Sequence, residues 1–541
     1  MTNSDSGRGH NVVNQPPPLT GRDLLADNLP LSEALEWSGS GWAASRAHQL
    51  GTILGSAEAA RNADEAHRDP PRLRTHDRYG HRLDEVEFNP AWHYFMDIAV
   101  SHGLHALPWS KPTEGAHAAR AAQFLLAAQV EPGHGCPISM TYASIPTLRA
   151  NRDLAKEWEP VITSNTYEPQ LRPVAQKHGA LIGMAMTEKQ GGSDVRANTT
   201  FAQRDGEAWR LTGHKWFCSA PMNDAFLVLA QAPGGLSCFL LPRVLPDGAK
   251  NAMQLLRLKD KLGNRSNASA EVEFDDAWAQ LVGEEGRGVR TIIEMVNHTR
   301  LDCVIASAAG MRQSVAEATW HAAHRSAFGH RLIDQPLMAS VLADLSVESE
   351  AATFTAMRLA AAYDDPNQQA FRRLATAVSK YWVCKRGPAH AAEALECLGG
   401  NGYVEEAPLA RRYREQPLMS IWEGSGNVMC LDVLRALVTA PETADAFLDE
   451  VTQALGANKF LDAHLVGLGE RMRRPEMSQA RRLSEDLALA LQASLLVRYS
   501  PAPVADAFCA SRLGPQRGLN YGDLPPGLSP ELIVQRHQPP V

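Results

Sequence analysis

Apolar and polar positions follow different spacings along the chain, and each spacing predicts a different kind of secondary structure. Between residues 90 and 178, apolar residues recur three and four positions apart, as in 116–130, and Pro and Gly separate the runs. This spacing predicts helices. From 180 to 281, short apolar stretches such as 226–230 alternate with Gly, Asn, Asp and Pro, which predicts antiparallel strands.

The helical spacing returns after the glycine-rich stretch 283–288. That stretch reads G-x-x-G-x-G without a strand–helix–strand unit around it, so it predicts a loop and not a dinucleotide site. A last helical section with proline breaks is expected beyond Pro441. Between the glycine-rich stretch and Pro441 we predict five helices, over 289 to about 329, 337–363, 369–386, 389–398 and 427–438.

This order of elements predicts a mostly helical α+β protein. It excludes a Rossmann fold and an eight-stranded barrel, since strands and helices do not alternate. We divide the chain into four parts: an N-terminal arm and helical domain (1–179), a middle β-domain (180–282), a helical bundle (283–439) and an extra helical domain (440–541).

Composition and charge limit the classes of function. The chain has 541 residues, of which 44% are hydrophobic and 21% charged, as in ordinary globular proteins with several domains. No apolar run approaches the roughly 18 residues of a membrane span, and the polar N-terminus lacks a secretory signal, so we expect a cytoplasmic protein. The eight cysteines form no Cys-x-x-Cys pair, and no metal site is predicted. A net charge of −8 gives no overall attraction to nucleic acid.

Glu423 is the first candidate for chemistry, because it lies between Trp422 and a flexible Gly-Ser-Gly-Asn loop. A glutamate in water has a pKa of about 4.3, and packing against an aromatic ring in a dry cleft raises that pKa toward the range of a proton-abstracting base. The alternative is a helix-capping acid, since the segment 427–438 looks like the start of a helix.

Two further segments offer groups that suit a flat, polar ligand. The loop 186–195 supplies the hydroxyls of Thr187 and Ser193 beside two glycines, and such a loop approaches a heterocycle or a diphosphate closely. In the strand 213–219, Phe217 is able to stack on a ring while Ser219 donates to it. The alternatives are an ordinary polar turn and core aromatics on an amphipathic strand.

Taken together, these segments resemble the acyl-CoA dehydrogenase flavoprotein family over about 180–438. The order and spacing of further motifs agree with this resemblance: Lys-Leu-Gly-Asn-Arg-Ser at 261–266, Thr299-Arg300, Arg-Ser-Ala-Phe-Gly at 325–329, Leu-Gly-Gly-Asn-Gly-Tyr at 398–403 and the Glu423 loop at 421–427. The family fold implies an N-terminal helical domain, a middle antiparallel β-barrel-like domain and a C-terminal four-helix bundle, here followed by an extra helical domain.

The resemblance implies an FAD-binding homotetramer. Within one subunit it places Thr187, Ser193, Phe217 and Ser219 along the isoalloxazine and ribityl side of FAD. Further cofactor-binding candidates are Met186, Trp422, Gly424, Ser425 and Asn427. To the diphosphate and adenosine of a neighbouring subunit's FAD it assigns Arg325, Phe328, Gln335, Glu396 and Gly400. An arginine suits a diphosphate because its planar fork carries permanent positive donors; the alternative for Arg325 is a surface ion pair.

The resemblance also implies a reaction, the α,β-dehydrogenation of an acyl-CoA thioester, with a separate electron acceptor. Glu423 matches the catalytic base, which takes the Cα proton while hydride leaves Cβ for the flavin. The thioester carbonyl is polarised by the ribityl hydroxyl and by the base residue's own backbone N–H. Arg300 either supports this acidic site or forms a structural ion pair.

Several features depart from the common family pattern. The loop 189–192 lacks the usual proline and alanine, Trp422 replaces a tyrosine, and Gly-Ser-Gly-Asn follows Glu423. Roughly 100 residues follow 440, and an arm precedes 42. These features resemble the AidB-like flavoproteins of the adaptive response to DNA alkylation, which implies that the C-terminal region binds double-stranded DNA and protects it.

The C-terminal part is not basic overall, because 440–541 contain ten Lys and Arg against twelve Asp and Glu. Its arginines are nevertheless concentrated between 471 and 482, and contacts with phosphates there would make binding depend steeply on salt. The alternative is a solvated helix face. The candidate DNA contacts in this run are Arg471, Arg473, Arg474, Arg481 and Arg482. The resemblance to the AidB-like branch implies two more, Arg435 and Arg517.

Three functions are therefore open. The first is a DNA-protecting flavoprotein of the alkylation response with weak acyl-CoA oxidation. The second is a metabolic dehydrogenase for short or branched acyl-CoA. The third is a scaffold that uses FAD structurally.

Overall fold

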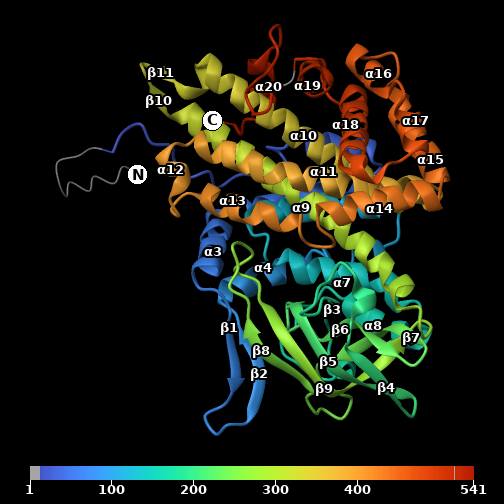
Figure 1. Cartoon of the computed structure of the whole chain (residues 1–541). Coiled ribbons are helices and arrows are strands. Elements are labelled where there is room, and N and C mark those ends of the chain that lie inside the picture. Colours follow the sequence, from blue (N-terminus) through green and yellow to red (C-terminus); the bar gives the residue numbers. More distant parts are fainter. Residues whose placement is uncertain (1–11, 517, 541) are drawn as a thin grey trace.

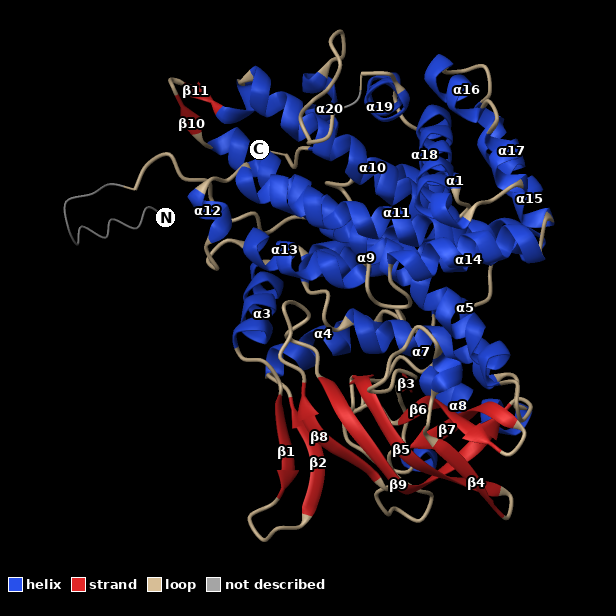
Figure 2. Cartoon of the chain, in the orientation of Figure 1, coloured by secondary structure: helices blue, strands red, loops and turns tan. Residues whose placement is uncertain are grey.

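The computed structural model describes residues 12–516 and 518–540, so Arg517 lies outside the described residues. Most helices form one layer and most strands the other (Figures 1 and 2). The N-terminal helices are α1 (Leu29–Trp37), α2 (Ala44–Leu54), α3 (Ala57–Arg68), α4 (Pro90–Ser101), α5 (Leu107–Ser110), α6 (Ala116–Val130), α7 (Gly135–Leu148) and α8 (Arg152–Ile162). Helix α6 is buried along nearly its whole length, as its all-round Ala and Leu content predicts.

A β-hairpin interrupts these helices, and the sequence reasoning missed it. It consists of β1 (Arg72–His76) and β2 (Arg82–Glu87), which pair antiparallel. Asp77 holds the turn, since its Oδ1 accepts from the backbone N–H groups of Tyr79 and His81. The 1–179 segment is therefore not purely helical. Its short polar strands carry too few apolar residues for a clear two-residue alternation.

The middle segment forms one seven-stranded sheet of β3 (Ile182–Ala185), β4 (Phe201–Asp205), β5 (Ala208–Ser219), β6 (Ala225–Ala232), β7 (Gly235–Pro242), β8 (Met253–Leu258) and β9 (Ser269–Val282). The strand order is β3-β6-β4-β5-β9-β7, with β8 on β9. An additional β6–β7 pairing turns the sheet back on itself, as a barrel-like domain requires.

The sheet is not wholly antiparallel, so that part of the expectation is wrong. Strand β6 pairs parallel with both β3 and β4, while the remaining pairs are antiparallel. Apolar spacing cannot reveal strand direction here, because the chain reaches β6 from β3 through a long connection and not through a hairpin. The predicted class, a mostly helical α+β fold, is confirmed.

The long helices of the C-terminal half are α9 (Gly288–His324), α10 (Pro336–Asp364) and α11 (Gln369–Glu396), followed by the short α12 (Gly400–Tyr403), then α13 (Pro408–Met419) and α14 (Gly426–Thr439). The two helices expected over 369–398 are one helix, because α11 continues through Pro388. Proline normally breaks a helix. Helix α11 packs against α9, α13 and α14 on several sides, and this packing keeps the segment helical through Pro388.

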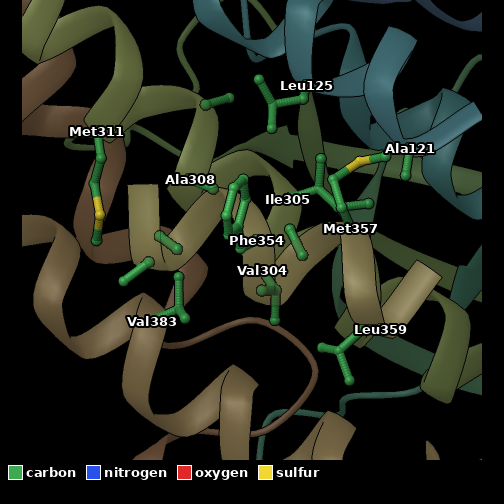
Figure 3. Close-up of a cluster of buried hydrophobic side chains, with 14 of the residues drawn as sticks. Ala121, Leu125, Val304, Ile305, Ala308, Met311, Phe354, Met357, Leu359 and Val383 are labelled. Atoms are coloured by element: carbon green, nitrogen blue, oxygen red, sulfur yellow. The ribbon is translucent and has the colours of Figure 1, made fainter. Parts of the chain in front are cut away.

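Helices from both halves of the chain share one apolar core (Figure 3). Leu125 of α6, Ile305 of α9, Phe354 of α10 and Val383 of α11 are all almost completely buried in it. The strands have a separate core that includes Phe226. A third cluster joins the two layers, and Met186 of the strand layer and Trp422 of the helical layer both pack against it.

The chain ends in further helices that pack on the bundle: α15 (Glu442–Val451), α16 (Lys459–Leu465), α17 (Leu468–Arg473), α18 (Ala480–Tyr499), α19 (Ala502–Phe508) and α20 (Pro530–His537). Helix α18 contacts α10 and α11, and α20 contacts α10. Fully buried Glu350 of α10 accepts from Arg536 and His537, which ties the end of the chain to the bundle. None of the described helices is long and apolar enough to cross a membrane.

Candidate active site

Glu423 lies in the turn between α13 and α14, in a conformation that side chains seldom adopt. Its φ is 57°, in the left-handed region, and Gly424 follows with φ 106°. Helix α14 begins at Gly426 and has no acid in its first turn. The helix-capping alternative therefore does not describe Glu423, and its strained backbone needs support from elsewhere.

Two cations from the long helices hold this turn. Arg300 of α9 donates from Nε to the carbonyl oxygen of Glu423 at 3.1 Å, and Lys380 of α11 donates to that of Gly424 at 2.5 Å. Arg300 also pairs with Asp432 of α14 at 2.8 Å. Both alternatives for Arg300 thus hold at once, because a structural ion pair fixes the guanidinium that holds the loop.

The electrostatics favour a base at Glu423. Burial raises the pKa of its carboxyl, and a hydrogen bond from Thr299 and the charges of Arg300 and Lys380 oppose this rise only in part. Asp432 shows the opposite balance: burial alone would raise its pKa, but Arg300 and Arg373 hold it below the usual value. The arginine charge is therefore shared with Asp432, and Glu423 remains the readily protonated acid.

The strand layer contributes a flat, polar platform. Phe217, near the end of β5, is 49% exposed, and Ser219 two residues later is half-buried. The backbone N–H of Trp216 donates to the carbonyl oxygen of Thr187 at 2.8 Å, which fixes the loop 186–195 beside β5. Burial raises the pKa of the Cys136 thiol at the start of α7 to about 12, and Ser219 and Glu423 both lie near enough to influence that pKa, so the platform and the acid border one region.

A buried ion pair, missed by the sequence reasoning, holds the same loop from beneath. Glu188 accepts from Lys215 of β5 at 2.8 Å, and both side chains are completely buried. It also accepts from the backbone N–H of Thr199 at 2.7 Å. Burial alone would raise the pKa of Glu188, but Lys215 and these donors lower it to about 2. Glu188 is thus a permanent anion that supports the loop and is not a candidate base.

These residues fit a flavin. Gly191 has φ 141° with open space around it, and Ser193 is exposed, so the loop backbone is accessible to a ligand. Met186 and Trp422 pack against one apolar cluster, which brings the strand layer and the Glu423 loop together. Ser425 and Asn427 are exposed beside them. An accessible aromatic face, hydroxyl donors and free backbone form a suitable cradle for an isoalloxazine ring.

The second set of predicted cofactor residues lies elsewhere. Arg325, Phe328 and Gln335 belong to the hairpin of β10 (Ser326–Ala327) and β11 (His330–Arg331) and the turn after it, and Figure 1 shows this hairpin at one end of the long helices, with α12 nearby. Phe328 is 94% exposed at φ 54°. Glu396 ends α11, and Gly400 begins α12. The chain itself does not bring this set to the Phe217 platform, so a role toward another subunit stays a prediction.

The predicted DNA contacts gather on three adjoining helices. Arg435 is on α14, Arg471 and Arg473 on α17, and Arg481 and Arg482 on α18, and these helices contact one another. All of them are exposed, as is Arg474. Their partners are few and distant: Arg471 lies 3.4 Å from Asp486, Arg474 lies 3.8 Å from Glu470 and Arg435 lies 4.0 Å from Asp432.

Arg481 differs from the other arginines because it reaches the cofactor loop. Its Nε donates to Oδ1 of Asn427 at 2.8 Å. Arg481, a predicted DNA contact, thus supports Asn427, a predicted FAD contact. Nothing in the sequence indicates this contact, because the two residues are 54 positions apart.

Lys380 and Cys136 are further site residues that sequence reasoning missed. Lys380 interrupts the apolar run of α11 and is almost completely buried. A lysine at a core position of an amphipathic helix was the available signal, since such a residue needs a partner. For Cys136 no comparable signal exists, because its neighbours come from distant strands. Among the described residues, no group of three or more His, Cys, Asp or Glu side chains is placed to hold a metal ion.

A helical bundle over a barrel-like sheet, with an acid-bearing loop where the two layers meet, is the architecture of acyl-CoA dehydrogenase-type oxidoreductases. Family models agree over most of the chain. Residues 14–169 match the adaptive response protein AidB N-terminal domain, 183–277 the acyl-CoA dehydrogenase middle domain, and 286–438 the acyl-CoA dehydrogenase C-terminal domain.

Individual relatives cover nearly the whole length. AidB of Escherichia coli (strain K12) is 45% identical over 95% of this chain and 96% of its own. The structure of Caenorhabditis elegans ACDH-11 in complex with C11-CoA superposes with a TM-score of 0.84 at 26% identity, covering 97% of each chain. Bd2924 in its apo-form gives 0.82 at 25% identity, over 90% of this chain and 99% of that one. The chain belongs to the acyl-CoA dehydrogenase family, in its AidB-like branch, and members of this family bind FAD.

Proposed function

We propose that this protein is an FAD-containing, acyl-CoA dehydrogenase-like homotetramer of the DNA alkylation response. It binds double-stranded DNA, protects it, and retains weak acyl-CoA dehydrogenase activity. The observation that carries the enzymatic part is the Glu423 turn, which holds a carboxylate of raised pKa beside the Phe217 and Ser219 platform. The near-full-length similarity to AidB supports the role in the alkylation response.

The residues perform defined tasks in the proposed reaction. Glu423 removes the proton from Cα of the thioester and must be ionised to do so. Arg300 and Lys380 fix the carbonyl oxygens of Glu423 and Gly424, which keeps the strained turn in place while the side chain works. Trp422 and Met186 exclude water from the region between the two layers. FAD, when bound, supplies the acceptor for the hydride that leaves Cβ.

The arginines on α14, α17 and α18 suit a DNA backbone and not a base sequence. They are exposed and loosely paired, so their charges are available to phosphates. Each phosphate neutralised by such a group contributes about −0.9 to the slope of log affinity against log salt concentration. We therefore expect sequence-tolerant duplex binding that weakens steeply as salt rises.

The function is tested on one purified sample of the full-length protein. Absorbance identifies bound flavin, a panel of acyl-CoA thioesters under anaerobic conditions measures its reduction, and duplex titration at several salt concentrations measures DNA binding. The proposal expects a yellow protein, slow reduction by several thioesters and salt-dependent binding to unrelated duplexes. DNA affinity that does not change with salt, or no binding, would reject the role in protection.

The second candidate, a metabolic short- or branched-chain dehydrogenase, is favoured by the ionisable Glu423 itself, which a DNA-binding role does not require. Rapid bleaching of the flavin by one thioester would select it. A yellow protein inert toward every thioester would instead select the structural use of FAD.

Deleting 440–541 is not a clean test of DNA binding. Helices α18 and α20 cover α10, and Leu487, Leu491 and Leu495 of α18 are completely buried in the shared core. Their removal would expose apolar surface and destabilise the bundle. Charge substitutions on the intact chain separate binding from folding.

A further inference from the structure

Lys261 is a half-buried cation next to the candidate flavin platform that the proposed reaction does not use. It lies between β8 and β9, in the Lys-Leu-Gly-Asn-Arg-Ser motif. Its ammonium donates to the carbonyl oxygen of Asn267 at 2.6 Å and to Oγ of Ser269 at 3.2 Å. Burial lowers the pKa of Lys261 to about 8, and the nearby carboxylate of Glu415 opposes this shift, so the ammonium form still prevails at pH 7.

Ser269 connects this ammonium to the platform. It is the first residue of β9 and lies opposite Ser219, the last residue of β5, in the antiparallel register. The two hydroxyl oxygens are 3.1 Å apart. Ser269 is 4% exposed, whereas Ser219 is only half-buried and borders the region of Glu423. A chain of hydrogen bonds therefore runs from the half-buried ammonium of Lys261 to an accessible hydroxyl.

The direction of this chain follows from its first member. A lysine ammonium only donates, so Ser269 accepts from it and has a single hydrogen left. That hydrogen points to Ser219, since a buried hydroxyl without a partner is costly. Ser219 thus accepts from Ser269, and its own hydrogen remains for another acceptor. The thiol of Cys136 is within reach of it, but sulfur is a weak acceptor, and a nitrogen or oxygen of a bound ring would compete for this hydrogen successfully.

We propose that Lys261 is a positioning residue for the flavin: through Ser269 it fixes Ser219 as a hydrogen-bond donor to the ring and places a positive charge behind it. This rests on the proposed binding of FAD. A donor and a nearby cation stabilise the electron-rich reduced ring more than the oxidised one. Lys261 therefore raises the midpoint potential of the bound cofactor.

The test is the midpoint potential of the FAD-reconstituted full-length protein at pH 7, measured for four variants. Lys261→Met removes donor and charge, Ser269→Ala breaks the chain but keeps the charge, and Lys261→Arg retains both. Lys250→Met is the matched control, because Lys250 is an exposed lysine of the same domain that pairs with Glu85.

We expect Lys261→Met to lower the ratio of reduced to oxidised flavin at fixed potential at least tenfold, which is about 30 mV for a two-electron couple. Ser269→Ala should lower the ratio in the same direction by about threefold, while Lys261→Arg and Lys250→Met stay close to wild type. A purely structural role would change thermal stability without this ordered change in potential.

A Lys261→Met potential equal to that of the Lys250→Met control would overturn the inference, as would a Lys261→Arg variant as impaired as Lys261→Met. Should Lys261→Met fail to fold, Ser269→Ala decides, and an unchanged potential there rejects the chain. A wild-type protein that stays colourless after reconstitution rejects the proposed FAD binding and this inference with it. A yellow protein with an unmoved potential rejects the inference alone.

Discussion

The Glu423 turn and the arginine surface on α17 and α18 both carry charge, but they are built in opposite ways. In the turn, cations from two helices fix the backbone of a partly covered acid, with donor–acceptor distances of 3.1 and 2.5 Å. On the surface, Arg471 and Arg474 are exposed and lie 3.4 and 3.8 Å from single acids. The turn depends on the position of each atom, whereas the surface depends on the amount of charge.

The largest difference in stability is expected between substitutions of two arginines that both pair with Asp432, the buried Arg300 and the exposed Arg435. Replacing buried Arg300 by Met leaves Asp432 partly unpaired and releases the Glu423 carbonyl, and should lower the free energy of unfolding by about 3 kcal/mol. Arg435→Met removes an exposed partner of the same Asp432 and should change it by less than about 0.5 kcal/mol. Urea unfolding of both variants measures this; equal losses would contradict the distinction.

A pH dependence should follow from Glu423 next. Because its pKa is raised by burial, the carboxyl is protonated, and unable to act as a base, below that raised pKa. Flavin reduction by a thioester should therefore rise about tenfold per pH unit on the acid side and level off above the pKa. The same shift means that the stability Glu423 contributes falls as pH rises through its folded pKa. Stopped-flow rates measured from below the ordinary glutamate pKa up to about pH 8 test this, and a flat profile over that whole range would refute it.

The effect on the arginine surface should be electrostatic with little change in stability. Arg473→Gln with Arg482→Gln should reduce the slope of log DNA affinity against log salt by about 2, while the free energy of unfolding stays within about 0.5 kcal/mol. The matched control is Arg72→Gln with Arg74→Gln on exposed β1, at the strand end of the molecule (Figure 1). If the control pair lowers the slope equally, the effect comes from losing two positive charges anywhere on the protein, and this surface is not the DNA-binding site.

The sequence predicted helices well where the apolar spacing reflects packing on one continuous core. The range 337–363 matches α10 to within one residue at each end. Pro388 misled the prediction of α11, since contacts with three other helices outweigh one lost hydrogen bond. The parallel pairing of β6 was equally inaccessible, because it depends on a connection whose path local spacing does not encode.

The candidate site divides in the same manner. Glu423, Thr187 and Ser219 came from motifs, because the chemistry of each is visible in its residue type. Lys380 and Cys136 did not, because their importance comes from contacts with segments more than 40 residues away. The Arg481 contact with Asn427 is of this second kind and joins the two regions that the sequence treated as separate.

In the proposed reaction, Glu423 is the base that faces a bound flavin. The most direct measurement is the rate of anaerobic flavin reduction by the best thioester, compared between Glu423→Gln and Glu405→Gln, an exposed acid paired with Arg414. The account predicts a loss of roughly 10²- to 10⁴-fold for the first and a wild-type rate for the second. Reduction by Glu423→Gln at the rate of the control would contradict it.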